Sequence, residues 1–150
     1  MAVPTGSGTE VLKAHSFDAV DDTGTQELII GVQHHTYTVI STLAYCISLN
    51  AVADFGILAL TGNGNHTGGT GTVMNIARFN ISVGQTFVFN DRFSFFGAEP
   101  TAYTEPMDTA AEQVAIAAQG QNTVQIYHFD VTHAGDDFDV HVTFLDQDWT

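Results

Sequence analysis

The stretch TYTVISTLAYCISL, residues 36–49, is the longest run in the chain with the pattern of a β-strand. Every second residue from Tyr37 onward is mostly large and apolar, and the residues between them are mostly small or polar. Because successive side chains of a strand point to opposite faces, this alternation predicts a strand with one buried face. The face expected to be buried consists of Tyr37, Val39, Ser41, Leu43, Tyr45, Ile47 and Leu49.

Shorter runs with strand-like composition lie on both sides of this stretch. They are residues 10–20 (extended or mixed), 26–31, 55–60, 73–81, 86–89, 92–96, 124–129 and 138–144. Turns are expected at residues 83–85, at Asn90-Asp91 and at residues 134–137. The turn at Asn90-Asp91 predicts a hairpin, and the turn at 134–137 predicts that the last two strands form an antiparallel pair.

Two long loops and one ambiguous segment complete the chain. The loops are residues 62–71, rich in glycine, and residues 97–108, which hold two of the three prolines. In residues 109–119, Thr109 and Glu112 fit a helix capping box, whereas Val114, Ile116 and Ala118 alternate as in a strand. A strand is favoured there because the run is short and its neighbours are strands.

These elements predict an all-β fold: an antiparallel β-sandwich of about eight strands, jelly-roll-like, with at most one short helix. A length of 150 residues suits a single domain, expected over residues 10–150 and preceded by an N-terminal arm at residues 1–9. Cys46 is the only cysteine, so no intrachain disulfide can form, and its place in a strand predicts a buried side chain.

Charge excludes several classes of function. Three Lys and Arg residues stand against seventeen Asp and Glu, giving a formal net charge of −14. Such a chain has almost no cations with which to displace counterions from phosphates, so nucleic acid is not an expected partner. Attraction to an anionic membrane is excluded for the same reason. No basic and apolar leader precedes the first strand, and no apolar run approaches the ~18 residues of a membrane span, so synthesis in the cytoplasm is expected.

Histidines and aspartates near the C-terminus offer one possible metal site. His128, Asp130 and His133 flank the last turn, and Asp139 and His141 share a face of the last strand. If the hairpin register set them opposite each other, two histidines and two carboxylates would approach one point, as in a zinc site. A polar outward face explains the same residues more simply, so no metal ligand and no cofactor is predicted.

The remaining chemical motifs are weaker. Asp136, Asp137 and Asp139 lack the spacing and closing glutamate of a calcium loop, so only incidental binding of hard cations is expected there. Asp21-Asp22 fits a turn. Neither a nucleophile elbow nor a zinc-protease motif occurs, so no catalytic residue is assigned and an enzyme is not expected.

Three stretches carry a resemblance to a known group of proteins. PTGSGTEVLK (residues 4–13), FVFNDRF (residues 87–93) and VHVTFLDQDWT (residues 140–150) together resemble small structural proteins of tailed bacteriophages, particularly marine and cyanobacterial ones. The resemblance implies a virion component that decorates or cements the capsid exterior, with the major capsid protein as a partner. Decoration proteins of this kind are commonly trimers, so a homotrimer is the favoured assembly.

Eight residues are the predicted assembly contacts. The segment from Val3 to Val11, which includes Pro4, is expected to extend over a neighbouring subunit, and Phe93, Phe95, Phe96 and Trp149 are expected to fill apolar seams. Arg92, one of the few basic residues, is expected to pair with a carboxylate. The alternative function is a lectin-like head or tail module that binds host glycans on an aromatic platform at Trp149 or Tyr103.

Overall fold

The computed structural model describes residues 9–20, 24–32, 35–51, 54–62, 72–97 and 124–148, and all regular structure in these ranges is β-strand. The strands are β1 (Thr9–Val20), β2 (Gly24–Ile30), β3 (His35–Ser48), β4 (Gly56–Gly62), β5 (Thr72–Phe79), β6 (Thr86–Phe89), β7 (Phe93–Phe96), β8 (Ile126–Val131) and β9 (Asp137–Asp148). No helix among the described residues is long and apolar enough to cross a membrane.

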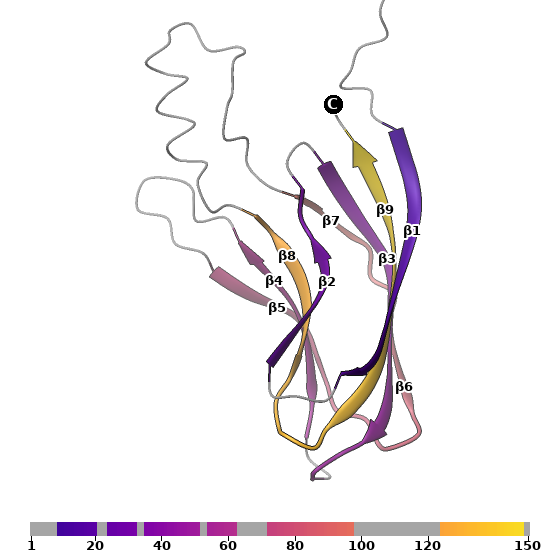
Figure 1. Cartoon of the computed structure of the whole chain (residues 1–150), viewed down its shortest axis with the longest axis vertical. Coiled ribbons are helices and arrows are strands. Elements are labelled where there is room, and N and C mark those ends of the chain that lie inside the picture. The colour runs from indigo at the N-terminus through magenta and orange to yellow at the C-terminus, as the bar shows by residue number, and fades with distance from the viewer. Residues whose placement is uncertain are drawn as a thin grey trace, which may run out of the picture.

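The strands form two antiparallel sheets that face each other (Figure 1). Sheet A has the order β1-β9-β3-β6, with β7 also paired to β3, and sheet B has the order β2-β8-β4-β5. The chain therefore crosses between the sheets at most of its connections, which is the strand order of a jelly roll. The predicted antiparallel β-sandwich is confirmed, with nine strands in the described part of the chain.

The last two strands do not pair with each other, so that prediction was wrong. β8 lies in sheet B between β2 and β4, whereas β9 lies in sheet A between β1 and β3. The turn before β9 carries the chain from one sheet to the other (Figure 1). Alternation specifies which face of a strand is buried, and it is satisfied equally well by a partner strand in either sheet.

The hairpin predicted at Asn90-Asp91 is also wrong. β6 and β7 both run antiparallel to β3, with Phe89 opposite Thr42 and Phe93 opposite Val39. They are therefore two pieces of one edge strand, interrupted by residues 90–92. An Asn-Asp pair tolerates a local break in an edge strand as readily as a reversal of the chain.

The burial predicted for residues 36–49 is right for the first half of β3 and wrong for the second half. Tyr37 and Val39 are buried, but beyond Ile40 the buried residues are Thr42, Ala44 and Cys46. The register with β9 shifts between Val39 and Ser41, which marks a β-bulge. One inserted residue exchanges the two faces of everything that follows, so Leu43, Tyr45 and Ile47 point outward.

The core lies between the sheets and is largely aromatic. β9 contributes Phe138, Val140, Val142 and Phe144, all buried, and β8 contributes Tyr127 and Phe129. The Tyr127 hydroxyl is hydrogen-bonded to Thr42 Oγ1 at 2.8 Å, which satisfies two buried polar groups across the sandwich. Burial raises the pKa of Tyr127 to about 12. Cys46 is buried as predicted, and burial raises the pKa of its thiol.

Several predicted features lie outside the described residues. They are the arm up to residue 8 with Val3 and Pro4, most of both long loops, the segment 109–119, Asp21-Asp22, Tyr103 and Trp149. Thr9, assigned to the arm, begins β1.

Candidate assembly surface and polar clusters

The outward face of sheet A follows from the burial of β9. Since Phe138, Val140, Val142, Phe144 and Asp146 are buried, the residues between them face away from sheet B. The register then places three outward rows across the sheet. They are Leu12–Leu145–Thr38–Ser94, Ala14–Thr143–Ser41 and Ser16–His141–Leu43–Val88.

These three rows of paired residues contain no carboxylate, lysine or arginine, and we call them the neutral face. The exposed residues Asp91 and Arg92, in the break between β6 and β7, lie at its edge. The neighbouring row on one side contains Glu10 with Gln147, Thr36 and Phe96, and the row on the other side contains Asp139 with Tyr45 and Thr86. Large apolar side chains are exposed on and beside the neutral face: Leu12 is 64% exposed, Val88 51% and Phe96 69%. In a chain with seventeen acidic residues, a surface of this composition is unusual.

The outward face of sheet B has a different composition. Its rows include Thr25–Asp130–Ile57–Arg78 and Glu27–His128–Ala59–Asn75. Two carboxylates and one guanidinium thus lie on these two rows of sheet B. The three adjacent rows of the neutral face hold none, and the carboxylates on that side of the sandwich, Glu10 and Asp139, lie in the rows that flank it.

The predicted assembly residues fall in three kinds of environment. Val11 and Phe96 are exposed, Phe93 is half-buried against the core, and Phe95 is buried in the core with its ring stacked on Tyr37. Phe95 therefore packs inside its own subunit and is not available for a contact between subunits. Arg92 is exposed and makes no ion pair with any residue in the described ranges, so the pairing expected for it is not found.

One end of β9 holds a buried aspartate between two basic groups. Lys13 Nζ lies 2.6 Å from Asp146 Oδ2, and His35 Nδ1 lies 2.6 Å from Asp146 Oδ1. Burial alone would raise the pKa of the Asp146 carboxyl, but the hydrogen bonds from Lys13 and His35 outweigh it and the pKa is lowered. These groups line a cavity of about 190 Å³ together with His15, Tyr37 and Phe144. Its volume is below the roughly 300 Å³ at which small-molecule sites begin.

A second polar cluster lies on the outward side of sheet B. Asp130 Oδ1 is 2.6 Å from His128 Nδ1, and His128 Nε2 is 2.7 Å from Thr61 Oγ1. The order carboxylate–imidazole–hydroxyl is that of a catalytic triad, but a hydrolase also needs donors for an oxyanion, which these three groups do not supply. Thr25 Oγ1 donates a further hydrogen bond to Asp130 Oδ1 at 3.0 Å. The cluster acts as a satisfied hydrogen-bond network for the buried His128.

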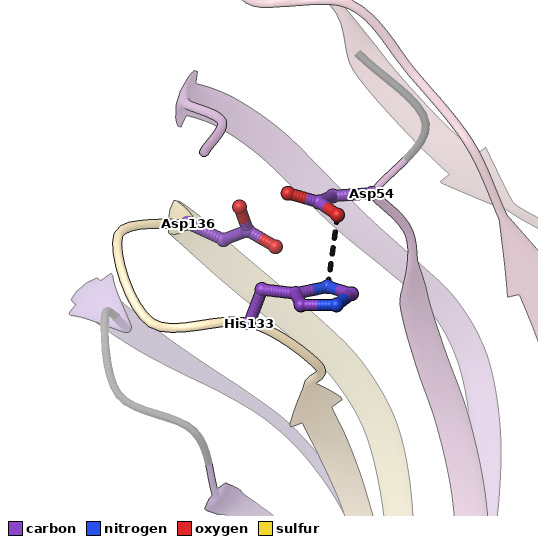
Figure 2. A group of neighbouring side chains, drawn as sticks. All are labelled: Asp54, His133 and Asp136. Carbon is purple, nitrogen blue, oxygen red and sulfur yellow. Dashed lines mark ion pairs between the residues drawn. The ribbon is translucent and has the colours of Figure 1, made fainter. Parts of the chain in front are cut away.

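A third cluster joins two connections at the other end of β9. Asp54 comes from the connection between β3 and β4, and His133 and Asp136 come from the connection between β8 and β9 (Figure 2). Ligand atoms of all three lie within 4.8 Å of one another. His133 Nδ1 is 2.8 Å from Asp54 Oδ1, and Asp136 Oδ2 is buried with no hydrogen-bond partner among the residues that the structure describes.

The metal ligands considered from the sequence do not converge. His128 and Asp130 belong to the cluster on sheet B, whereas Asp139 Oδ1 accepts a hydrogen bond from the Ala19 amide and His141 contacts Ser16 on the neutral face. His133 does join a cluster, but with Asp54, which sequence reasoning missed. Asp54 has no neighbouring motif, and only the jelly-roll connectivity brings the β3–β4 and β8–β9 connections to the same end of the sandwich (Figure 1).

No protein-family model matches this chain, and no curated protein is significantly similar to it. The fold and the clusters described above therefore carry the functional argument.

Proposed function

We propose that the chain is a non-enzymatic virion protein that decorates or cements the exterior of a tailed-phage capsid, as a homotrimer assembled through the neutral face of sheet A. The single observation that carries the self-assembly is the absence of charge across the three rows of that face, in a chain of formal charge −14. The resemblance of residues 4–13, 87–93 and 140–150 to phage structural proteins supports the location.

Electrostatics favours a second copy of this chain as the occupant of the neutral face. Two copies each carry fourteen negative charges in excess and repel each other over most of their surfaces. They meet with least repulsion where neither presents a carboxylate. Exposed Leu12, Val88 and Phe96 supply apolar area to bury at that contact.

A closed trimer turns the three neutral faces toward a common axis and leaves the acidic surfaces in water. An acidic outer surface suits the outside of a capsid, because packaged DNA inside the shell would repel it. The partner beneath the trimer is the major capsid protein, and synthesis takes place in the host cytoplasm.

A matched pair of variants tests the assembly surface. Val88→Glu introduces one carboxylate into the neutral face, and Val73→Glu introduces the same charge on β5 of sheet B at a nearly equal exposure, 51% against 55%. We expect Val88→Glu to convert the oligomer to monomer, as measured by multi-angle light scattering, while Val73→Glu leaves the mass unchanged. Equal behaviour of the two variants would remove the neutral face from the proposal.

Intact phage particles test the proposed location on the capsid exterior. Antibody labelling is expected on the capsid surface in electron micrographs, and capsids that lack the protein are expected to lose integrity at a lower temperature. Labelling confined to the tail, together with hits on a glycan array, would support the lectin-like alternative instead.

A further inference from the structure

We propose that Asp54, His133 and Asp136 form a binding site for one divalent transition-metal cation of the Zn²⁺ type, which joins the β3–β4 connection to the β8–β9 connection. The sequence alone predicts no dedicated metal ligand. The three side chains converge at this end of the sandwich, and a cation site there is a property beyond the proposed function (Figure 2).

Backbone amides hold both carboxylates in place. The Asn50 amide donates to Asp136 Oδ1 at 2.8 Å, and the Ala51 amide donates to Asp54 Oδ2 at 2.7 Å. Each carboxylate therefore has one oxygen fixed by the same short segment. The second oxygen of Asp54, Oδ1, contacts His133 Nδ1, and the second oxygen of Asp136, Oδ2, is available to a further partner. Ligands oriented in advance in this way reduce the entropy lost when a cation binds.

The second oxygen of Asp136 has no hydrogen-bond donor in the described part of the chain. Asp136 is 0% exposed, and none of the described residues donates a hydrogen bond to its Oδ2. A buried carboxylate oxygen without a donor is costly, so the site requires either a proton or a cation. Burial and the adjacent Asp54 carboxylate also raise the pKa of Asp136, as expected where two carboxylates approach each other.

The donor set selects the kind of cation. Ca²⁺ and Mg²⁺ take oxygen ligands, whereas Zn²⁺ takes imidazole nitrogen together with carboxylate oxygen. One imidazole and two carboxylates provide three protein ligands, which leaves a fourth position for water. The side chain of His133 is 52% exposed, so the cation and its water have access from solvent. In the absence of a cation, the His133 ring remains hydrogen-bonded to Asp54 Oδ1.

The two connections that supply the ligands cross between the sheets in opposite directions. The first leads from β3 in sheet A to β4 in sheet B, and the second leads from β8 in sheet B to β9 in sheet A. The end of β3 already contacts the second connection, because Ser48 Oγ donates to the Gly135 carbonyl at 3.2 Å. A cation bound here would hold the sheets together at this end and would stabilise the folded chain by mass action.

The test uses the purified full-length protein stripped with EDTA and then dialysed separately against Zn²⁺, Ca²⁺ and Mg²⁺. We expect about one Zn²⁺ per chain by elemental analysis and a rise in Tm of roughly 5–10 °C at a free Zn²⁺ concentration of a hundred times Kd. Ca²⁺ and Mg²⁺ are expected to give no stoichiometric binding. Binding of Ca²⁺ with equal stoichiometry, or no change in Tm with Zn²⁺, would overturn the proposal.

Variants locate the cation. Asp136→Asn and His133→Gln are expected to lower the Zn²⁺ affinity at least tenfold and to remove most of the shift in Tm. Two controls match them: Asp18→Asn removes one exposed carboxylate, and His141→Gln removes one exposed histidine, and both should keep full binding. The exposed His133 tolerates substitution, so it gives a result even if Asp136→Asn fails to fold. Equal losses in all four variants would mean that Zn²⁺ binds the acidic surface diffusely, which contradicts the proposal.

Discussion

The two ends of β9 each have a buried aspartate, and the two are compensated in opposite ways. Asp146 is 6% exposed and has Lys13 on one oxygen and His35 on the other. Asp136 is 0% exposed and has one backbone amide, with its second oxygen facing the Asp54 carboxylate and His133. The pKa of Asp146 is lowered and the pKa of Asp136 is raised. The Asp146 carboxylate is neutralised by groups of the chain itself, whereas we propose that the Asp136 carboxylate is neutralised by a bound cation.

This difference separates structural ion pairs from binding sites in an acidic protein. The chain has only three Lys and Arg residues, and one of them, Lys13, is committed to Asp146. A second, Arg78, lies over the Phe55 ring at 3.6 Å from its centroid. Few internal cations remain for the other end of β9, which is why an external one is expected there.

The largest effect is expected when the same substitution is made at both ends. Asp146→Asn removes the buried carboxylate that Lys13 and His35 both contact at 2.6 Å and should lower the free energy of unfolding by about 2–3 kcal/mol. Asp136→Asn in EDTA should leave the stability unchanged or raise it by up to about 1 kcal/mol, because its amide can donate toward Asp54 Oδ1. Urea unfolding measures both. A similar loss in the free energy of unfolding of both variants would mean that the two aspartates are compensated in the same way, which contradicts the account.

The pH dependence of stability sharpens the same contrast. The lowered pKa of Asp146 means that its contribution is present above the unfolded pKa of about 3.9 and is lost as pH falls through the folded value. The charged groups that face it are Lys13, His35 and, through His35, Asp148. The stability difference between wild type and Asp146→Asn should therefore shrink below pH 4. A difference that stays constant down to pH 2 would contradict the ion pair.

Asp136 predicts the opposite slope in the protein stripped of metal. Because its folded pKa is raised, its contribution is full below the unfolded pKa and is lost as pH rises through the folded value. As pH increases above 4, the free energy of unfolding of wild type should thus fall relative to that of Asp136→Asn. The same urea series in EDTA measures it, and a slope of the other sign would contradict the account.

The turn that presents Asp136 is the next most sensitive element. Gly135 has a φ of 96°, and a Cβ added there would lie 3.4 Å from Asn50 Cβ. Gly135→Ala should cost about 1–2 kcal/mol and should also weaken Zn²⁺ binding. Gly84, with a φ of 84° and open space around it, is the control: Gly84→Ala should cost a similar strain and leave Zn²⁺ binding unchanged.

The smallest effect is expected from Lys13. Its side chain is 44% exposed, so solvent screens the ion pair with Asp146. Lys13→Gln should cost about 0.5–1 kcal/mol by urea unfolding, less than Asp146→Asn, because His35 still donates to the carboxylate. A loss equal to that of Asp146→Asn would show that Lys13 alone compensates the charge.

The sequence predicts the strands well because alternation is a local property. The strand at residues 138–144 has its buried face as expected, with Phe138, Val140, Val142 and Phe144 all in the core. Pairing is not local, and neither the crossing of β8 and β9 between sheets nor the continuity of β6 and β7 leaves a compositional trace. The bulge at Ile40 is equally hidden, because Val39 and Ile40 are both apolar and either one could be the buried residue.

The clusters could not be predicted from spacing. Lys13 and Asp146 are 133 residues apart, and Asp54 meets His133 and Asp136 only because two crossings between the sheets occur at one end. The aspartates and histidines near the C-terminus were recognisable as candidate ligands. Which of them meet depends on which sheet each strand enters, and this decision is made by packing of the whole sandwich.

The molar mass of the wild-type chain in solution tests the central claim most directly. Sedimentation equilibrium over a range of concentrations is expected to give three times the 16.1 kDa of one chain. Association should strengthen with added salt, because salt screens the repulsion between copies of charge −14. A single species of 16.1 kDa at every concentration and salt level would contradict the account.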